Sequence, residues 1–192
     1  MSLSRRQFIS ATAATLGVAT LPGIAHARYS VPDKHMPKYV RIGAHIPAGE
    51  IHVDPNRFYL YWTMPEGQAI RYAIRVGRKG LYEDGTFTIG AKKKWPSWRP
   101  TDEMIAREPH KYEKYAEGMP GGRGNPLGAR ALYLFRANGR DSFLRIHGTT
   151  EPWTIGRAVS NGCAGMINEH IAHLYEFVPR GTKVVLYPQT NV

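Results

Sequence analysis

Residues 147–166, HGTTEPWTIGRAVSNGCAGM, carry the features that decide the fold and the chemistry of this chain. They contain its single cysteine, Cys163, sixteen residues after His147. A thiol that attacks a carbonyl needs access to its substrate, a base, and donors for the oxyanion that forms. His147 is the candidate base, and Gly162 lets a substrate backbone approach closely. The donors of an oxyanion pocket are expected among the backbone N–H groups of Ser160, Asn161, Gly162 and Cys163.

Two other roles for these residues have to be weighed. A lone cysteine is more often a small buried hydrophobic residue than a nucleophile, and a lone histidine is more often structural. A zinc site is a further alternative, because His170 and His173 lie three residues apart on a predicted helix and can join His147 and Cys163 as ligands. Against zinc, a metal would occupy the thiolate, and both helical histidines are expected beside the buried face. We therefore expect no metal and no cofactor.

The full pattern H-G-T-x-x-P-x-x-I-G-x-x-x-S-x-G-C-x-x-M resembles, position for position, the signature of the L,D-transpeptidase catalytic domain, also called the YkuD domain. The resemblance implies that Cys163 is the nucleophile, that His147 is its base, and that the substrate is the peptide stem of peptidoglycan. The thiolate attacks the carbonyl of the third stem residue, the terminal D-alanine leaves, and an amine of a neighbouring stem resolves the thioester. Gly148, Thr149 and Arg157 are expected to complete the substrate-binding surface.

The chain departs from this pattern at Gly165. The family usually has an arginine at that position, two residues after the cysteine, where it helps to hold the donor stem. Losing a charge-assisted hydrogen bond of this kind costs about 1.5–3 kcal/mol. We therefore expect another arginine to supply the contact, and the candidates are Arg123, Arg145 and Arg157.

The same acyl-enzyme can serve other reactions. Water as the acceptor would make the protein an L,D-carboxypeptidase, and a lipoprotein amine would make it a lipoprotein-to-wall transferase. A non-catalytic wall-binding module is an alternative of a different class, for which Gly165 would be a sign of degeneration. Because binding needs neither side chain, the intact pair of His147 and Cys163 favours an enzyme.

The composition indicates one domain without disulfides. A chain of 192 residues can bury a core, and one cysteine cannot form an intramolecular disulfide. The formal charge of +11 favours an anionic partner. Because the basic residues are scattered and no nucleic-acid motif occurs, we expect the anionic cell-wall surface rather than nucleic acid.

Residues 1–27 have the three parts of an export signal. Arg5 and Arg6 stand in S-R-R-x-F, which resembles the twin-arginine consensus, and an A-x-A cleavage site occupies residues 25–27. The apolar run between them, about 14 residues long, is too short to span a bilayer. We expect a periplasmic protein that is exported folded by the twin-arginine (Tat) machinery, with no integral membrane segment in the mature chain.

The predicted fold is mainly β: a mixed β-sandwich of the YkuD type with one α-helix in the C-terminal half and a long irregular insertion. Residues 28–47 are expected to form an extended N-terminal arm, and residues 48–188 the catalytic domain. Period-two alternation between turn signals gives the strands. They are predicted at residues 51–54, 57–62, 69–76, 86–93, 131–135, 143–146 and 183–187.

Residues 92–128 form the insertion, in which a short helix is predicted at residues 101–107. A Gly/Pro-rich insertion of this length is often a lid or a binding loop, and a passive surface excursion is the alternative. Trp95 and Trp98 can stack on a glycan or lie in a core. After the signature, Asn168 is predicted to cap the C-terminal helix. The apolar face of that helix consists of Ile171, Leu174, Tyr175 and Val178.

Overall fold

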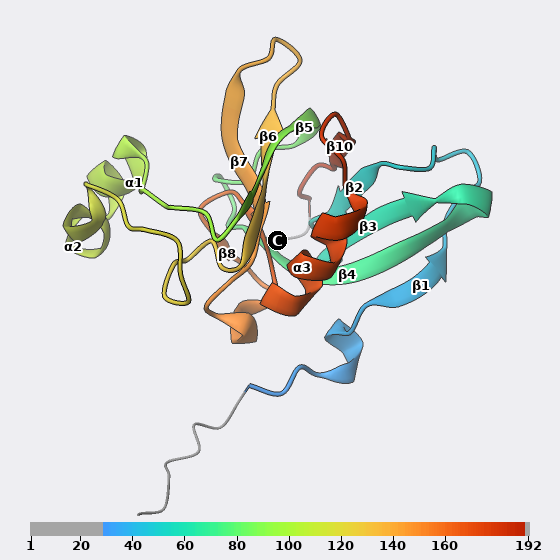
Figure 1. The fold of residues 1–192 in the computed structure, drawn as a ribbon, viewed down its shortest axis with the longest axis horizontal. Helices are drawn as coiled ribbons and strands as arrows, with labels where there is room; N and C mark the ends of the chain where they lie inside the picture. The colour runs from blue at the N-terminus through green and yellow to red at the C-terminus, as the bar shows by residue number, and fades with distance from the viewer. Residues whose placement is uncertain (1–28, 191–192) are drawn as a thin grey trace, which may run out of the picture.

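The structure, a computed structural model, describes residues 29–190, and the predicted export signal at residues 1–27 lies outside them (Figure 1). The strands are β1 (Lys38–Arg41), β2 (Ile51–Asp54), β3 (Tyr59–Met64), β4 (Gln68–Gly77), β5 (Gly85–Lys94), β6 (Arg130–Phe135), β7 (Asp141–His147), β8 (Ala158–Ser160), β9 (Ala164–Met166) and β10 (Lys183–Leu186). The α-helices are α1 (Asp102–Arg107), α2 (Pro109–Tyr112) and α3 (Asn168–Phe177). Short 3-10 helices are η1 (Asp33–His35), η2 (Pro65–Gly67), η3 (Glu113–Tyr115) and η4 (Pro152–Thr154).

Within residues 29–190 the strands form one ten-stranded sheet that closes on itself. Neighbours follow the order β1-β4-β3-β2-β10-β5-β6-β7-β9, and β9 pairs in turn with β4. The predicted meander β2-β3-β4 is antiparallel, whereas β10 with β2, β7 with β9, and β4 with β8 are parallel pairs. The predicted mainly β, mixed class is confirmed, and the closure gives it a barrel-like form.

The core lies inside this barrel, between the inward side chains of the strands and one face of α3. Alternate residues of β4 point inward, and α3 packs against β6 and β7. The predicted apolar face of α3 is confirmed, because Ile171, Leu174 and Val178 are fully buried and Tyr175 packs beside them. Burying side chains of this size contributes about 1.5–3 kcal/mol each. The largest fully buried side chains include Tyr72, Ile74, Leu132, Ile146 and Met166.

Asn168 has a different role from the predicted one. The N-cap of α3 is Ile167, without a side-chain cap bond, and Asn168 is the first helical residue. Its amide bridges two segments instead: Oδ1 accepts the N–H of Ala129 at 2.9 Å, and Nδ2 donates to the carbonyl oxygen of Thr149 at 3.1 Å. The prediction of a cap was wrong because these orphan backbone groups compete for the same side chain.

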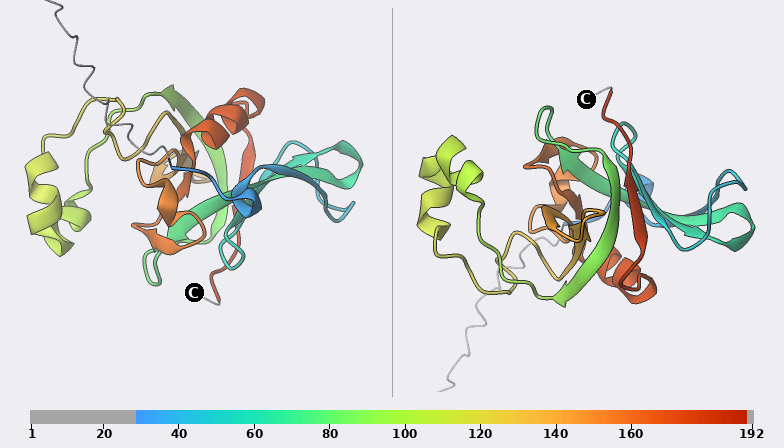
Figure 2. Two further views of the ribbon diagram at one scale, coloured as in Figure 1. Left: turned by 90° about the horizontal axis from the view of Figure 1, so that it is seen from below. Right: turned by 90° about the horizontal axis from the view of Figure 1, so that it is seen from above.

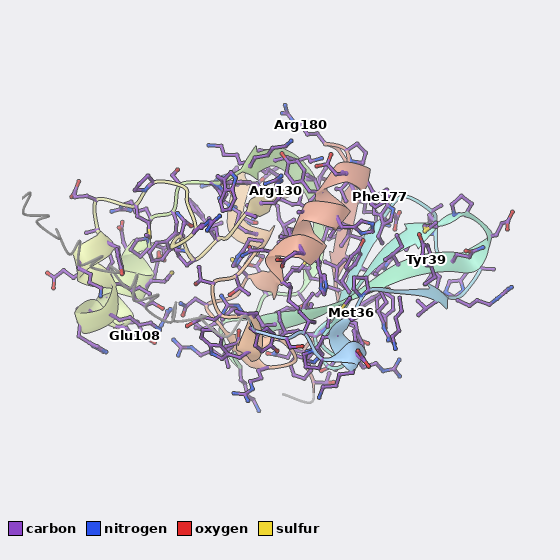
Figure 3. All side chains as sticks on the ribbon, turned by 60° about the horizontal axis from the view of Figure 1, so that its bottom comes forward. Met36, Tyr39, Glu108, Arg130, Phe177 and Arg180 are labelled. Carbon is purple, nitrogen blue, oxygen red and sulfur yellow. The ribbon has the colours of Figure 1, made fainter. Side chains whose placement is uncertain are left out.

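The N-terminal arm is part of the sheet, since β1 pairs antiparallel with β4. Residues 92–94 of the predicted insertion belong to β5, so the irregular segment begins at residue 95. It projects from the barrel on the side opposite the β3–β4 ribbon (Figure 2), and Glu108 lies in it (Figure 3). The predicted helix is confirmed as α1, capped by the Thr101 side chain. Trp98 packs edge-on against two tyrosines of the insertion, whereas Trp95 is 47% exposed.

Candidate active site

The barrel closes at β9, and this closure defines the candidate active site. On one side β9 runs parallel to β7, with His147 opposite Gly165. On its other side β9 runs antiparallel to β4, with Arg75 opposite the same glycine. Gly165 therefore lies between His147 and Arg75 in one row across the sheet, and Cys163 lies directly before β9.

The thiol of Cys163 lies against the edge of β7. Its Sγ atom is 3.9 Å from the carbonyl oxygen of Phe143, and the backbone N–H of Arg145 donates to it. Burial raises the pKa of the thiol above its usual value and outweighs the charges of Arg145 and Arg75, which favour the thiolate. Although protein atoms surround the sulfur, the residue is only partly buried. The resting group is therefore a neutral thiol that a substrate can reach.

His147 is the last residue of β7 and is only 4% exposed. Its Nδ1 donates to the carbonyl oxygen of Gly148 at 2.5 Å, which fixes the ring and leaves Nε2 as the acceptor. Burial, and next the charge of Arg75, lower the pKa of His147 to about 3. The imidazole is consequently neutral near pH 7. A general base must be neutral in this way before it can accept a proton.

The loop that precedes the cysteine is braced from within. The hydroxyl of Ser160 donates to the carbonyl oxygen of Cys163 at 2.6 Å and accepts the N–H of Gly162 at 3.3 Å. Gly162 has φ +120°, and a Cβ there would lie 2.8 Å from the carbonyl oxygen of Leu81. Only glycine fits this position, so the loop geometry depends on it.

The two residues after His147 are fixed by Asn168. A Cβ on Gly148 would lie 2.1 Å from Asn168 Oδ1, and the carbonyl of Thr149 accepts its amide. Thr149 is 2% exposed, and its hydroxyl accepts the N–H of Glu151 at 2.9 Å. The structure thus gives both residues a positioning role, and their predicted contact with substrate stays a prediction.

Asn161 joins the cysteine loop to the insertion. Its Oδ1 accepts from Arg107 at 2.9 Å and from Arg78 at 3.2 Å, and its Nδ2 donates to the hydroxyl of Tyr112 at 2.7 Å. Arg78 in turn pairs with Glu108 of the insertion at 2.5 Å. The side chain of Asn161 is therefore occupied by this contact. Its predicted role as an oxyanion donor concerns the backbone N–H alone.

The arginines predicted to substitute for the missing one lie elsewhere or are occupied. Both terminal nitrogens of Arg145 pair with Asp141 at 2.7 Å, and its guanidinium lies 4.1 Å from the centre of the Tyr133 ring. Arg123 and Arg157 are exposed.

Arg75, which the sequence did not single out, is an arginine whose charge acts on both His147 and Cys163. Arg75 lies inside the apolar run AIRYAIRV, residues 69–76. This position could have indicated its importance, because arginine is rarely buried unless it is paired.

The histidines of α3 are not placed for a metal at Cys163. His170 is buried, so its predicted place beside the buried face was wrong, and its ring packs near Tyr72. Nδ1 of His173 bonds the hydroxyl of Tyr72 at 2.8 Å. Within the described part of the chain, no group of three His, Cys, Asp or Glu residues is arranged to hold a metal ion.

The family model of the L,D-transpeptidase catalytic domain matches residues 48–186. A putative L,D-transpeptidase of Fuscovulum blasticum is 33% identical over 189 residues, 90% of this chain and 94% of the relative. The probable L,D-transpeptidase YbiS of Escherichia coli is 36% identical over 132 residues, which are 67% of this chain and 40% of that protein.

Solved structures agree on the fold. A Brucella melitensis protein described as a probable carnitine operon oxidoreductase has a TM-score of 0.56 and 47% identity, over 82% of this chain and 96% of its own. L,D-transpeptidase 3 from Mycobacterium tuberculosis has a TM-score of 0.53 at 17% identity, over 74% and 61% of the two chains.

The barrel-like β fold, here with a cysteine before its closing strand and a buried histidine on the neighbouring strand, is shared with solved L,D-transpeptidases. The chain belongs to the L,D-transpeptidase catalytic domain family. Membership supports an enzyme that acts on peptidoglycan.

The protonation states of the pair can be tested by alkylating Cys163 with iodoacetamide at several pH values. Because burial raises the pKa of the thiol, the rate should rise with pH through an apparent pKa above the usual thiol range, without a step near pH 6.5. The urea-unfolded protein serves as the control, in which the thiol should titrate near about 8.5. An apparent pKa well below that of the unfolded control would contradict the neutral pair and indicate a thiolate–imidazolium pair.

Proposed function

We propose that the protein is a peptidoglycan L,D-transpeptidase in which Cys163 forms a thioester with the third residue of a tetrapeptide stem. One observation carries the proposal: a buried, neutral His147 keeps Nε2 free on the strand whose edge holds the Cys163 sulfur. That arrangement supplies a base and a nucleophile for acyl transfer at a site that is largely withdrawn from water.

The reaction balances with these two groups alone. The thiol proton passes to His147 Nε2 as sulfur attacks the carbonyl, because neither charged partner is favoured at rest. The C–N bond then breaks, and the imidazolium gives its proton to the leaving D-alanine amine. An amine of a second stem attacks the thioester, His147 takes the amine proton, and the thiol is restored. Backbone N–H groups of the Ser160–Cys163 loop stabilise the oxyanion in each half.

The acceptor separates this function from its alternatives. We expect purified protein incubated with tetrapeptide muropeptides to form dimers that lack one D-alanine, detected by mass spectrometry. The Cys163→Ala variant is the control and should form none, with unchanged thermal unfolding because the residue is only partly buried.

Other products would decide between the remaining possibilities. Trimmed monomers alone would overturn transpeptidation in favour of a carboxypeptidase. Transfer only to a lipoprotein amine would indicate a lipoprotein-to-wall transferase, and binding without any product would indicate a wall-binding module.

We also propose that the predicted lid, residues 92–128, covers the cysteine loop with the part that follows β5, from residue 95 onward. The support is the contact of Asn161 with Arg107 and Tyr112, one side chain from each of the two insertion helices. A lid of this kind excludes water from the thioester and forms one wall of the acceptor cleft.

The lid predicts that loosening these contacts exposes the thiol. Tyr112→Phe combined with Arg107→Ala should increase the rate at which a bulky maleimide labels Cys163 by up to about thirtyfold, since it removes two hydrogen bonds worth about 1 kcal/mol each. Arg99→Ala is the matched control, because Arg99 bonds only within the insertion, to Asp102 and Ala116. Equal labelling rates in all three proteins would show that the insertion does not cover the thiol.

Export by the twin-arginine route to the periplasm is the third part of the proposal. No helix among residues 29–190 is long and apolar enough to cross a membrane. Replacing Arg5 and Arg6 by lysine should leave uncleaved precursor in the cytoplasm, measured by cell fractionation, because the receptor reads the guanidinium groups. Normal periplasmic yield of the double variant would point to the general secretory route.

A further inference from the structure

The side chain of Arg75 crosses β9 directly above Gly165. A Cβ on Gly165 would lie 2.6 Å from Nε and 2.7 Å from Cγ of Arg75, closer than real side-chain contacts allow. The backbone of Gly165 does not itself require glycine, because its φ lies outside the left-handed region. A side chain at position 165 and Arg75 in its observed conformation therefore exclude each other.

Half of the Arg75 guanidinium has no partner. Nη1 donates to Glu151 Oε2 at 2.8 Å and to the hydroxyl of Thr154 at 3.1 Å. Nε is buried without a hydrogen bond, and Nη2 has none to any residue in the described range 29–190. The side chain is 9% exposed, so water does not solvate it freely. An unpaired Nε on a largely buried cation is costly, and Nη2, which is not among the buried unpaired atoms, is the donor that a ligand can reach first.

The free edge of the guanidinium, Nε and Nη2, has the geometry of a carboxylate receptor. Two parallel N–H donors on one edge of arginine match the two oxygens of a carboxylate. Arg75 also lies in the row of His147, and its charge acts on both His147 and Cys163. A carboxylate bound there would be held next to the reacting thiol.

We infer that Arg75 is the donor-binding residue of this enzyme and that it holds the terminal carboxylate of the stem peptide. This inference rests on the proposed function. A tetrapeptide donor carries a free carboxylate on the residue that follows the attacked carbonyl, and that residue leaves with it. The family pattern has an arginine at position 165. In this chain Arg75, which lies opposite Gly165 on β4, would supply the guanidinium instead.

Binding tests the inference without turnover. In the Cys163→Ala background, Arg75→Gln should weaken binding of a tetrapeptide stem by about ten- to a hundredfold, measured by calorimetry. Amidating the terminal carboxylate should weaken binding to the Arg75 protein similarly and abolish the difference between the two proteins. Arg71→Gln is the matched control, because Arg71 lies on the same strand and packs 4.2 Å from the centre of the Tyr59 ring. It should bind the stem normally.

Moving the arginine gives a second, kinetic test. Gly165→Arg alone should raise the KM for the donor, because the new side chain collides with Arg75. Arg75→Ala alone should raise KM with a smaller change in kcat, and the combination of both should restore most of the donor KM. Thermal unfolding of each variant separates lost binding from lost folding.

Equal affinity of Arg75→Gln and its parent, or the same Arg75 dependence with an amidated stem, would overturn the inference while leaving the thioester chemistry intact. A gain in activity from Gly165→Arg alone would also overturn it. If the stem does not bind the Cys163→Ala protein and does not acylate the wild type, both the inference and the proposed function fail.

Discussion

The closing strand β9 carries Gly165 at its centre, and the space that a side chain there would fill is taken by Arg75. This glycine lets Arg75 of β4 extend across β9 toward His147 of β7. The pairing of β9 on both sides closes the sheet, and the residue just before β9 is Cys163. Closure of the sheet thus places the cysteine, the histidine and Arg75 along one strand.

The electrostatics of the site follow from that burial. Burial favours the neutral forms of both His147 and Cys163; the charges of Arg75 and Arg145 add to this effect at His147 and oppose it at Cys163. Desolvation therefore outweighs the attraction between the arginines and the thiolate at Cys163, as expected for a group withdrawn from water. Proton transfer has to accompany attack, and a guanidinium with a free edge can orient the donor while it offsets the negative charge that develops.

Local patterns were enough to predict much of this arrangement. Alternating apolar residues predicted β2 and β4 within one residue at each end, and the signature in residues 147–166 indicated the family. The sequence did not indicate β9, because three residues inside a loop have no periodicity to detect. Arg75 and Asn168 were missed or misread since their partners are far away in the chain, and only closure of the barrel brings them together.

The measurement that tests the central claim most directly is a ¹⁵N NMR titration of the His147 ring in the folded protein. The account predicts a neutral imidazole with the proton on Nδ1, bonded to the Gly148 carbonyl, and no titration between about pH 8 and 5, because burial keeps its pKa at about 3. A ring that titrates near pH 6.5, or that carries its neutral proton on Nε2, would contradict the claim that barrel closure presents Nε2 of His147 as the base.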